Sequence, residues 1–400
     1  MNPKRTVAMS TALLGACSLI LAGCGSSSSS GPTSKSTVKV MAMGVFASTV
    51  ISLPDALAAL KAGVAQVNAS GGANGHQIDL TICDDGFDPN KAAACARQAV
   101  SEGDVAVIAP YEYFSANALP VLEAAKIPII YNHLSADIDG KSPISYPRDA
   151  GTPGVYATLG IELAKEGCTN VGAIVAAFPA AALGAKWLET GLKSVTSSAT
   201  LKQQPIPATA ADVSAPVAKL VSSGIDCFVS VSAAETAAQA AKAVRTSGHS
   251  EIKLGAVSSE YDAASLQTLG SIAEGLIITG QEYRPSDTDV PAVQAASKAL
   301  DKYQPGAKFN TSFAMGAWDS VRVLAQVIAK INGDVTPASV ATAAASTSPP
   351  TDLYAGFSYS APAPVSAYPQ AKNWKYLLWK VTGGKAVRPG NDFISPTTLH

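Results

Sequence analysis

The chain has 400 residues, of which 15% are charged, and its 29 basic and 30 acidic side chains leave a net charge of −1. Acidic and basic residues are scattered, so the sequence does not predict the basic face that binds nucleic acid. Beyond the N-terminal residues, no stretch of the sequence is long and apolar enough to cross a bilayer. A chain of this length favours two domains over a single core.

The first 23 residues have the pattern of an export signal. Lys4 and Arg5 precede a nearly uncharged run over 6–22, which is short for a membrane span. The run ends in Leu21-Ala22-Gly23-Cys24, which looks like a bacterial lipobox, the site at which a cysteine is acylated before cleavage. We therefore expect residues 1–23 to be a lipoprotein signal peptide and Cys24 to carry a lipid anchor. A plain secretory signal and an N-terminal anchor helix are the alternatives.

A Gly/Ser-rich segment follows Cys24, and such composition behaves as a flexible coil. Residues 24–37 are therefore expected to tether the protein. This predicts a location at the outer face of the cell membrane, where the chain is lipid-anchored, or in the periplasm.

The four cysteines beyond Cys24 are expected to form disulfides, because an exported chain meets an oxidising compartment. Cys83 ends a predicted strand, and Cys95 lies in the helix pattern that follows. Cys168 and Cys227 each lie just before or at the start of an apolar strand, and neighbouring strands are about 5 Å apart. We predict the pairs Cys83–Cys95 and Cys168–Cys227. Long spacings and scattered histidines make a metal site a weaker interpretation, and a catalytic thiol a weaker one still.

Strand and helix patterns alternate from residue 38 onward, with short turns between them. Such alternation predicts a parallel sheet with helices on both faces. Asp88 is the expected N-cap of its helix, with Pro89 as the first helical residue. The elements are strands over 38–45, 76–83, 104–110 and 127–132, and helices starting at Pro54 and spanning 90–100 and 115–126.

The same rhythm restarts after 146–149. Helices are predicted over 156–166, 183–194, 213–222 and 235–246, with strands over 170–178, near Leu201, and over 226–232, 252–257 and 275–283. Helices over 293–303 and 313–332 follow, and 373–385 looks like one arm of a hairpin. The predicted fold class is α/β, with two doubly wound parallel-sheet lobes joined by three crossovers. Lobe 1 would comprise 38–147 plus 286–350, and lobe 2 148–285 plus 351–400.

The loops after the strands are the candidate site, because ligands bind beyond the carboxyl ends of parallel strands and in clefts between domains. Ser115 and Ser135 sit where helix N-caps belong, so the N–H groups there could hold a carboxylate. Simple capping of the helices is the alternative. Asp84 and Asp85 are adjacent and point to opposite faces of a strand, so hydrogen bonding in a turn is favoured over acid/base chemistry or metal binding.

Residues 63–100 resemble the first domain of the leucine/isoleucine/valine-binding protein family, the type I periplasmic solute-binding proteins of ABC importers. Asn68, Gly71-Gly72, Gly75, Asp84-Asp85 and the helix at Pro89 carry this resemblance. It continues through 118–130, 275–283 and 313–328, and covers nearly all of the mature chain. In the second domain, the order of predicted strands and helices matches the family, whereas few individual residues do.

This resemblance implies two hinged lobes that capture a solute and deliver it to a permease with cytoplasmic ATPases. It implies no enzymatic activity, no cofactor and no metal, and we expect a monomer with no nucleic-acid partner. The solute would be small and organic: a branched-chain amino acid or similar molecule, an amide, or a small aromatic or organic acid.

The ligand residues of the family transfer only in part. In its amino-acid binders, groups after the third and fourth strands hold the carboxylate, which corresponds here to 113–115 and 134–135. A tyrosine of the second domain is replaced by Leu183, and Glu260 is the nearest candidate for the acid that meets an ammonium group. These departures argue against an α-amino acid. The expected ligand-binding residues are Phe46, Tyr111, Tyr113, Ser115, Leu134, Ser135, Leu183, Ser232, Glu260 and Tyr283.

The aromatic residues after the third strand suit a flat or apolar molecule, with packing beneath the loop as the alternative.

Two functions other than import are compatible with an exported α/β protein, an enzyme and a ligand sensor. An extracytoplasmic enzyme is disfavoured because the sequence lacks a G-x-S-x-G elbow, an H-E-x-x-H motif and a phosphate-binding glycine-rich loop. A sensor that passes ligand occupancy to a membrane receptor is equally compatible with the sequence.

Overall fold

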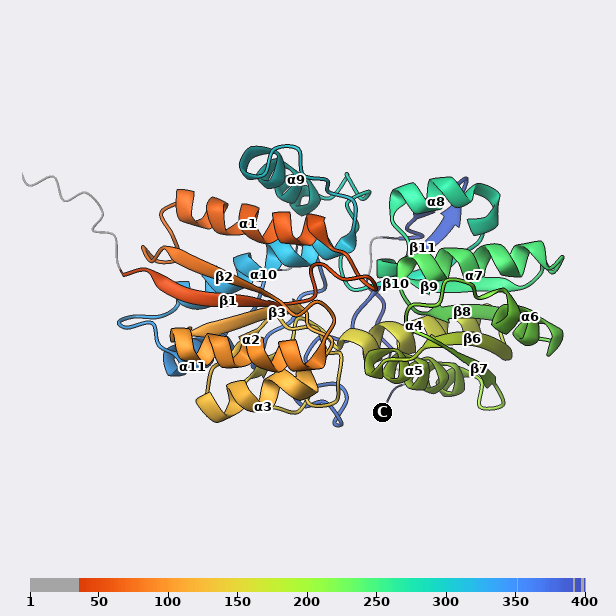
Figure 1. The fold of residues 1–400 in the computed structure, drawn as a ribbon, viewed down its shortest axis with the longest axis horizontal. Coiled ribbons are helices and arrows are strands. Elements are labelled where there is room, and N and C mark those ends of the chain that lie inside the picture. The colour runs from red at the N-terminus through yellow and green to blue at the C-terminus, as the bar shows by residue number, and fades with distance from the viewer. Residues whose placement is uncertain (1–35, 351, 391–392, 397–398, 400) are drawn as a thin grey trace, which may run out of the picture. The chain divides into compact units, whose positions relative to one another are not determined.

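The structure is a computed structural model that describes residues 36–350, 352–390, 393–396 and 399 (Figure 1). The predicted signal peptide, the lipidation site Cys24 and nearly all of the tether lie outside these residues. Within the described segments, no helix combines the length and apolar character that a membrane span needs.

The described strands form two sheets, and the first has the order β2-β1-β3-β4-β5 with parallel pairing (Figure 1). Helices α1 and α10 lie on one face of this first sheet, and α2 and α3 lie on the other. Asp88 caps α2, as predicted, by accepting from the N–H groups of Asn90 and Lys91. The elements are β1 (Val38–Gly44), α1 (Pro54–Ala69), β2 (Ile78–Asp84), α2 (Pro89–Glu102), β3 (Ala106–Tyr111), α3 (Ser115–Ala125), β4 (Ile129–Ile130) and β5 (Ser145–Tyr146).

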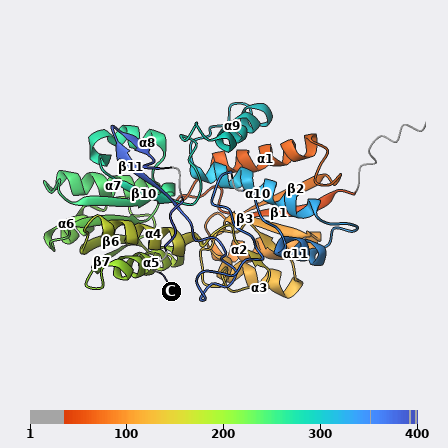
Figure 2. The same ribbon diagram turned by 180° about the vertical axis from the view of Figure 1, so that it is seen from behind.

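The second sheet has the order β12-β11-β10-β9-β8-β6-β7, seen from behind in Figure 2. Strands β6 to β10 pair in parallel, and β11 and β12 form the antiparallel hairpin whose first arm the sequence predicts. The predicted α/β fold class is confirmed. The elements are α4 (Gly151–Lys165), β6 (Asn170–Ala176), α5 (Pro179–Val195), β7 (Thr200–Ile206), α6 (Ser214–Ser222), β8 (Cys227–Val231), α7 (Ala234–Thr246), β9 (Lys253–Val257), α8 (Ala263–Leu269), β10 (Ile277–Gly280), β11 (Leu377–Thr382) and β12 (Lys385–Val387).

The chain returns from the second sheet to the first and then back again. Helices α9 (Pro291–Tyr303), α10 (Ser312–Ala329) and α11 (Pro337–Ala345) pack into the core of the first sheet. Tyr354 and Tyr359 belong to that same core, and from Val365 the chain joins the core of the second sheet. The connecting segments therefore lie around 147–150, 281–290 and 360–364.

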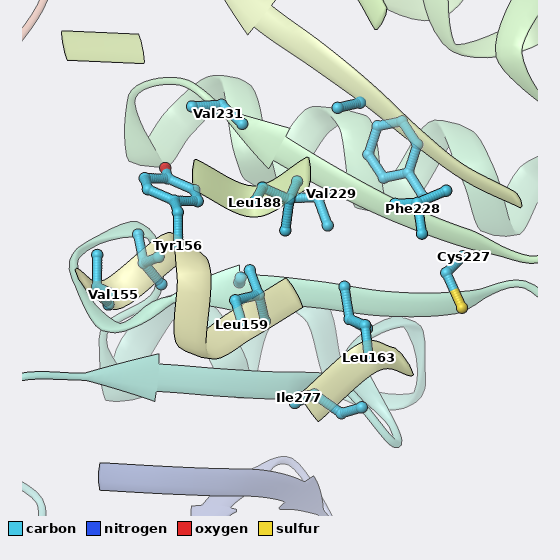
Figure 3. Close-up of a cluster of buried hydrophobic side chains, with 14 of the residues drawn as sticks. Val155, Tyr156, Leu159, Leu163, Leu188, Cys227, Phe228, Val229, Val231 and Ile277 are labelled. Atoms are coloured by element: carbon cyan, nitrogen blue, oxygen red, sulfur yellow. The ribbon is translucent and has the colours of Figure 1, made fainter. Parts of the chain in front are cut away.

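Helix α4 is buried along almost its entire length and anchors the second sheet (Figure 3). Its residues Leu159 and Leu163 lie in one cluster with Leu188 of α5 and Phe228 of β8 (Figure 3). The backbones of α4 and α5 approach closely at Gly191, where an added Cβ would overlap the carbonyl oxygen of Ala157. This close packing fixes α4 against the C-terminal half of α5.

Both predicted disulfides are present. Cys83 of β2 is bonded to Cys95 of α2, and Cys168 is bonded to Cys227 at the start of β8. Asp226 lies close to the second bridge, but its carboxylate accepts from the N–H groups of 169 and 170. Because both sulfur atoms are consumed by the bridge, this cluster is not a metal site.

Candidate functional site

A cavity of about 390 Å³ lies among the loops that follow strands of both sheets. This volume is within the range of about 300–1,000 Å³ that is typical of small-molecule sites. The first-sheet wall, as we call it, consists of Ser48–Leu53, Tyr111, Tyr113, His133 and Thr311–Phe313. The second-sheet wall consists of Thr152, Val155, Tyr156, Phe178, Ala180, Ala181, Val231–Glu235, Val257 and Ser259. Arg148, Gln281 and Glu282 complete the lining from the segments that connect the sheets.

Three of the predicted ligand residues, Tyr111, Tyr113 and Ser232, line this cavity. The other predicted residues lie outside the described lining. They are Phe46, Ser115, Leu134, Ser135, Leu183, Glu260 and Tyr283. The ligand-binding role of all ten residues stays a prediction.

The structure corrects the predicted helix caps at Ser115 and Ser135. Ser115 is the first residue of α3, whose N-cap is Phe114, and turns over 136–141 follow Ser135. The buried hydroxyl of Ser115 donates to Asp139 Oδ2 over 2.7 Å, and the hydroxyl of Ser135 donates to the backbone oxygen of Glu112 over 2.7 Å. Asp139 supplies a buried acceptor four residues after Ser135, so the two loops are joined to each other behind the cavity.

Glu260 lies behind the second-sheet wall. Its carboxyl accepts from the hydroxyl of Tyr156 over 3.3 Å and from the N–H of Val257 over 3.2 Å. Burial raises the pKa of Glu260 well above its ordinary value. The predicted partner of an ammonium group is therefore held in an internal hydrogen-bond network and provides no fixed negative charge at the cavity.

Arg148 and Glu282 form a charged floor that the sequence analysis did not place in the site. Arg148 Nε lies 2.5 Å from Asp149 Oδ2, and its Nη1 lies 3.2 Å from Glu282 Oε2. Burial raises the pKa of Glu282 to about 7, although Arg148 acts against this shift. Gly316 of α10 makes room for the guanidinium, because a Cβ there would lie 2.5 Å from Nη1. In a chain with few charges, the positions of Arg148 and Glu282 near the boundaries of the predicted lobes were the signal that could have revealed this floor.

Aromatic rings make up much of the first-sheet wall. Tyr111 and Phe313 meet edge to face at 4.9 Å, and Tyr113 lies 5.9 Å from the ring of His133. Burial lowers the pKa of His133 to about 4, so its ring is neutral near pH 7. The wall thus offers apolar surface and no fixed charge.

The second-sheet wall contains the N-terminal ends of α5 and α7. Their N-cap residues are Phe178 and Ala233, and no described side chain caps either helix end. First-turn residues Ala180, Ala181, Ala234 and Glu235 line the cavity. Uncapped N–H groups and the positive end of the helix dipole favour a negatively charged group, which at α7 competes with the first-turn carboxyl of Glu235 and at α5 meets no acidic first-turn residue.

Paired α/β sheets, joined by several segments around a cavity of this size, are the architecture of a two-lobed solute-binding protein. The chain belongs to the periplasmic binding protein family, whose model matches residues 42–363. The predicted resemblance to leucine/isoleucine/valine-binding proteins is confirmed by this match and by the solved structures that the fold resembles.

Three of these structures illustrate the likeness. A possible leucine/isoleucine/valine-binding protein from Rhodopirellula baltica SH 1 is 16% identical, with a TM-score of 0.76 over 90% of this chain and 98% of that one. A fatty acid ABC transporter substrate-binding protein from Thermomonospora curvata is 17% identical, with a TM-score of 0.75 over 91% and 94%. An ABC transporter solute-binding protein from Rhodopseudomonas palustris HaA2, in complex with p-hydroxybenzoic acid, is 17% identical, with a TM-score of 0.75 over 90% and 97%. No curated protein sequence matches the chain significantly.

Proposed function

We propose that the protein is an extracytoplasmic solute-binding lipoprotein of an ABC importer. It captures a small organic solute between lobe 1 (38–147 plus 286–350) and lobe 2 (148–285 plus 351–400). The observation that carries this proposal is the division of the cavity lining between loops of both sheets. A solute that contacts both walls favours the closed arrangement of the lobes, because ligand shifts a conformational equilibrium through its differential contacts. The partners are a permease and its ATPases, which the protein serves as a monomer.

The solute class that the lining supports best is an organic acid with a flat or branched apolar body. The uncapped ends of α5 and α7 favour its carboxylate. Aromatic groups such as Tyr113 and Phe313 suit its apolar part. Glu260 is engaged with Tyr156, which disfavours an ammonium group at that place. The similar solved structures include proteins named for leucine or fatty acid and a complex with p-hydroxybenzoic acid, and each of these molecules contains a carboxyl group.

The binding proposal is tested by a thermal-shift screen across amino acids, amides, short organic acids and aromatic acids, followed by calorimetry of the hits. We expect an organic acid to bind with micromolar or tighter affinity and to reduce the radius of gyration measured by small-angle scattering. If none of the four classes of compound changes the melting temperature or the scattering profile of the protein, the proposal is wrong.

The anchoring proposal concerns Cys24 and needs a separate test. We expect mass spectrometry of the membrane-extracted protein to find an acylated N-terminal Cys24, and a Cys24→Ser variant to move to the soluble extracytoplasmic fraction. An unmodified Cys24 would overturn the anchor and leave the binding proposal untouched.

A further inference from the structure

Two buried carboxyl groups, Asp85 and Glu112, meet behind the first-sheet wall of the cavity. Both residues are at most 2% exposed. Their carboxyl groups lie close enough to influence each other's ionisation. Among the described residues, no N–H or hydroxyl donates to Asp85 Oδ2 or to Glu112 Oε2. Two carboxyl groups can hydrogen-bond to each other only when one of them carries a proton.

The second oxygen of each carboxyl group holds a backbone turn. Asp85 Oδ1 accepts from the N–H of Phe87 over 2.7 Å, and Glu112 Oε1 accepts from the N–H of Phe114 over 2.5 Å. Phe87 has a φ of +64°, a left-handed conformation that costs free energy for a bulky residue. The hydrogen bond from its N–H to Asp85 helps to maintain this conformation.

The residues that these turns carry connect the two walls of the cavity. The ring of Phe87 lies 6.0 Å from that of Tyr113 and 5.0 Å from that of Phe114. On its other side, Phe87 meets Phe178 edge to face at 5.4 Å. Tyr113 belongs to the first-sheet wall and Phe178 to the second-sheet wall, so Phe87 joins the two walls directly.

We propose that Asp85 and Glu112 share one proton and thereby position Phe87 between Tyr113 and Phe178, so that loss of this proton at higher pH loosens the contact between the walls. The inference rests on the proposed function only in giving this contact a role in closing the cleft on a solute. Asp85 and Glu112 are positioning residues, because they act through the aromatic rings and lie outside the described lining of the cavity.

The direction of the pH dependence follows from burial. Burial raises the pKa of Asp85 to about 6 and raises the pKa of Glu112 well above its ordinary value, where the charge of Asp85 adds to the effect. A carboxyl group with a raised pKa keeps its proton at low pH and loses it as the pH rises. Below about pH 6 both groups carry a proton, above it one proton remains for the pair to share, and two mutually repelling carboxylates replace this arrangement once Glu112 also ionises at higher pH.

Other charged groups surround the pair, and they bear on its titration. Asp84 and Asp88 lie on the same turn, and Lys91 of α2 approaches Gly86. Asp139, from the loop after β4, raises the pKa of Glu112 further, and it titrates itself near pH 6. His133 beside Tyr113 is neutral above about pH 5, because its pKa is about 4. Variants of the pair are therefore needed to separate its proton from that of Asp139.

Hydrogen–deuterium exchange of the full chain without added solute tests the inference directly. In the wild type, after correction for intrinsic exchange, we expect protection of 84–88 and 112–115 to fall about tenfold between about pH 5.5 and about pH 8.5. Protection of 177–182, which contains Phe178, should fall with it. Glu112→Gln provides a permanent amide donor to Asp85, so its protection should stay within about twofold across this range. Asp85→Asn offers the equivalent donor to Glu112 and serves as the second variant if Glu112→Gln does not fold.

Two further variants separate positioning from general stability. Asp104→Asn removes another buried carboxyl whose pKa is about 6, at the opposite end of β3 from Glu112, and it should keep the wild-type pH dependence. Phe87→Leu should uncouple 177–182 from the pH while 112–115 still responds. Wild-type protection that is independent of pH, or an unchanged pH dependence in Glu112→Gln and Asp85→Asn, would overturn the inference. Because no solute is needed, this outcome is distinct from a failed solute screen, which would overturn the proposed function alone.

Discussion

The two walls of the cavity are built by different means. On the first-sheet side, buried side chains such as Asp139 and Glu112 hold the loops through hydrogen bonds to hydroxyls and backbone N–H groups. On the second-sheet side, α4 and α5 are held by close backbone packing, and uncapped helix ends are presented to the cavity. The geometry of the first wall therefore rests mainly on buried carboxyl groups, whereas that of the second rests mainly on backbone packing, with Glu260 bonded to Tyr156 behind it. The experiments below break or sharpen this contrast, starting with the largest expected effect.

The disulfide of the second-sheet side closes a longer loop than that of the first, with separations of 59 and 12 residues. Restriction of the unfolded chain predicts that loss of Cys168–Cys227 costs about 4 kcal/mol of unfolding free energy and loss of Cys83–Cys95 about 3 kcal/mol. Double alanine variants of each pair, compared by urea denaturation, check this order. Equal or inverted losses would show that loop length does not set the difference.

The contact of α4 with α5 should not tolerate a side chain at Gly191. Gly191→Leu places its Cβ against the carbonyl oxygen of Ala157, so we expect a loss of about 3 kcal/mol. Gly390→Leu is the matched control, because a Cβ at Gly390 meets no atom within 4 Å. Equal urea midpoints for the two variants would contradict the proposed packing constraint.

The stability of the protein should fall as the pH rises from about 4 to about 7. Burial raises the pKa of Asp104, Asp139 and Asp319 to about 6, above the value of about 3.9 for an unfolded chain. The folded state then binds more protons than the unfolded state in this interval, so its stability is present in acid and is lost as the pH passes the folded-state pKa. Asp139→Asn should remove on the order of 2 kcal/mol of this loss.

Urea denaturation at several pH values measures this effect. A wild type that becomes more stable between about pH 4 and about pH 7 would contradict the sign, since the raised carboxyl pKa values act in the opposite direction. An Asp139→Asn variant that follows the wild-type profile would remove Asp139 from the explanation.

The smallest expected effect concerns the uncapped end of α7. Ala233→Asp would cap the helix and stabilise the fold by about 1 kcal/mol. Its carboxylate would also compete with the solute for the same N–H groups, so affinity for an organic acid should fall about tenfold, or about 1.4 kcal/mol. Ala233→Asn caps without adding charge, and should weaken binding less. Calorimetry with the tightest organic acid of the screen checks both, and unchanged affinity in Ala233→Asp would exclude the α7 end from the site.

The sequence was most informative where local chemistry determines structure. Asp88 with Pro89 predicted the start of α2, and the strand pattern correctly paired the cysteines. Alternating elements predicted the sheets, and the rule on carboxyl ends predicted the loops that surround the cavity. Helix α11 was missed because its small residues form a weak apolar stripe.

The details of the site depended on contacts distant in sequence. Tyr156 lines the cavity from α4, and Arg148 lines it from the segment after β5, a two-residue strand too short to predict from the sequence. Ser135 was assigned to a helix cap because its folded partners, the backbone oxygen of Glu112 and the carboxylate of Asp139, come together only once the loop has folded. Sequence patterns of loops therefore located the cavity without resolving its chemistry.

The position of β11 has a consequence for how the molecule is assembled. Strand β10 pairs on one side with β9 and on the other with β11, whose residues begin at Leu377. On the first sheet, Asp55 of α1 receives hydrogen bonds from Thr311, 256 residues later. A chain emerging from the ribosome thus cannot complete either sheet until its last quarter has been synthesised. The first sheet needs α10, which is made after the strands β6 to β10, and the second sheet needs β11, which is made after α10.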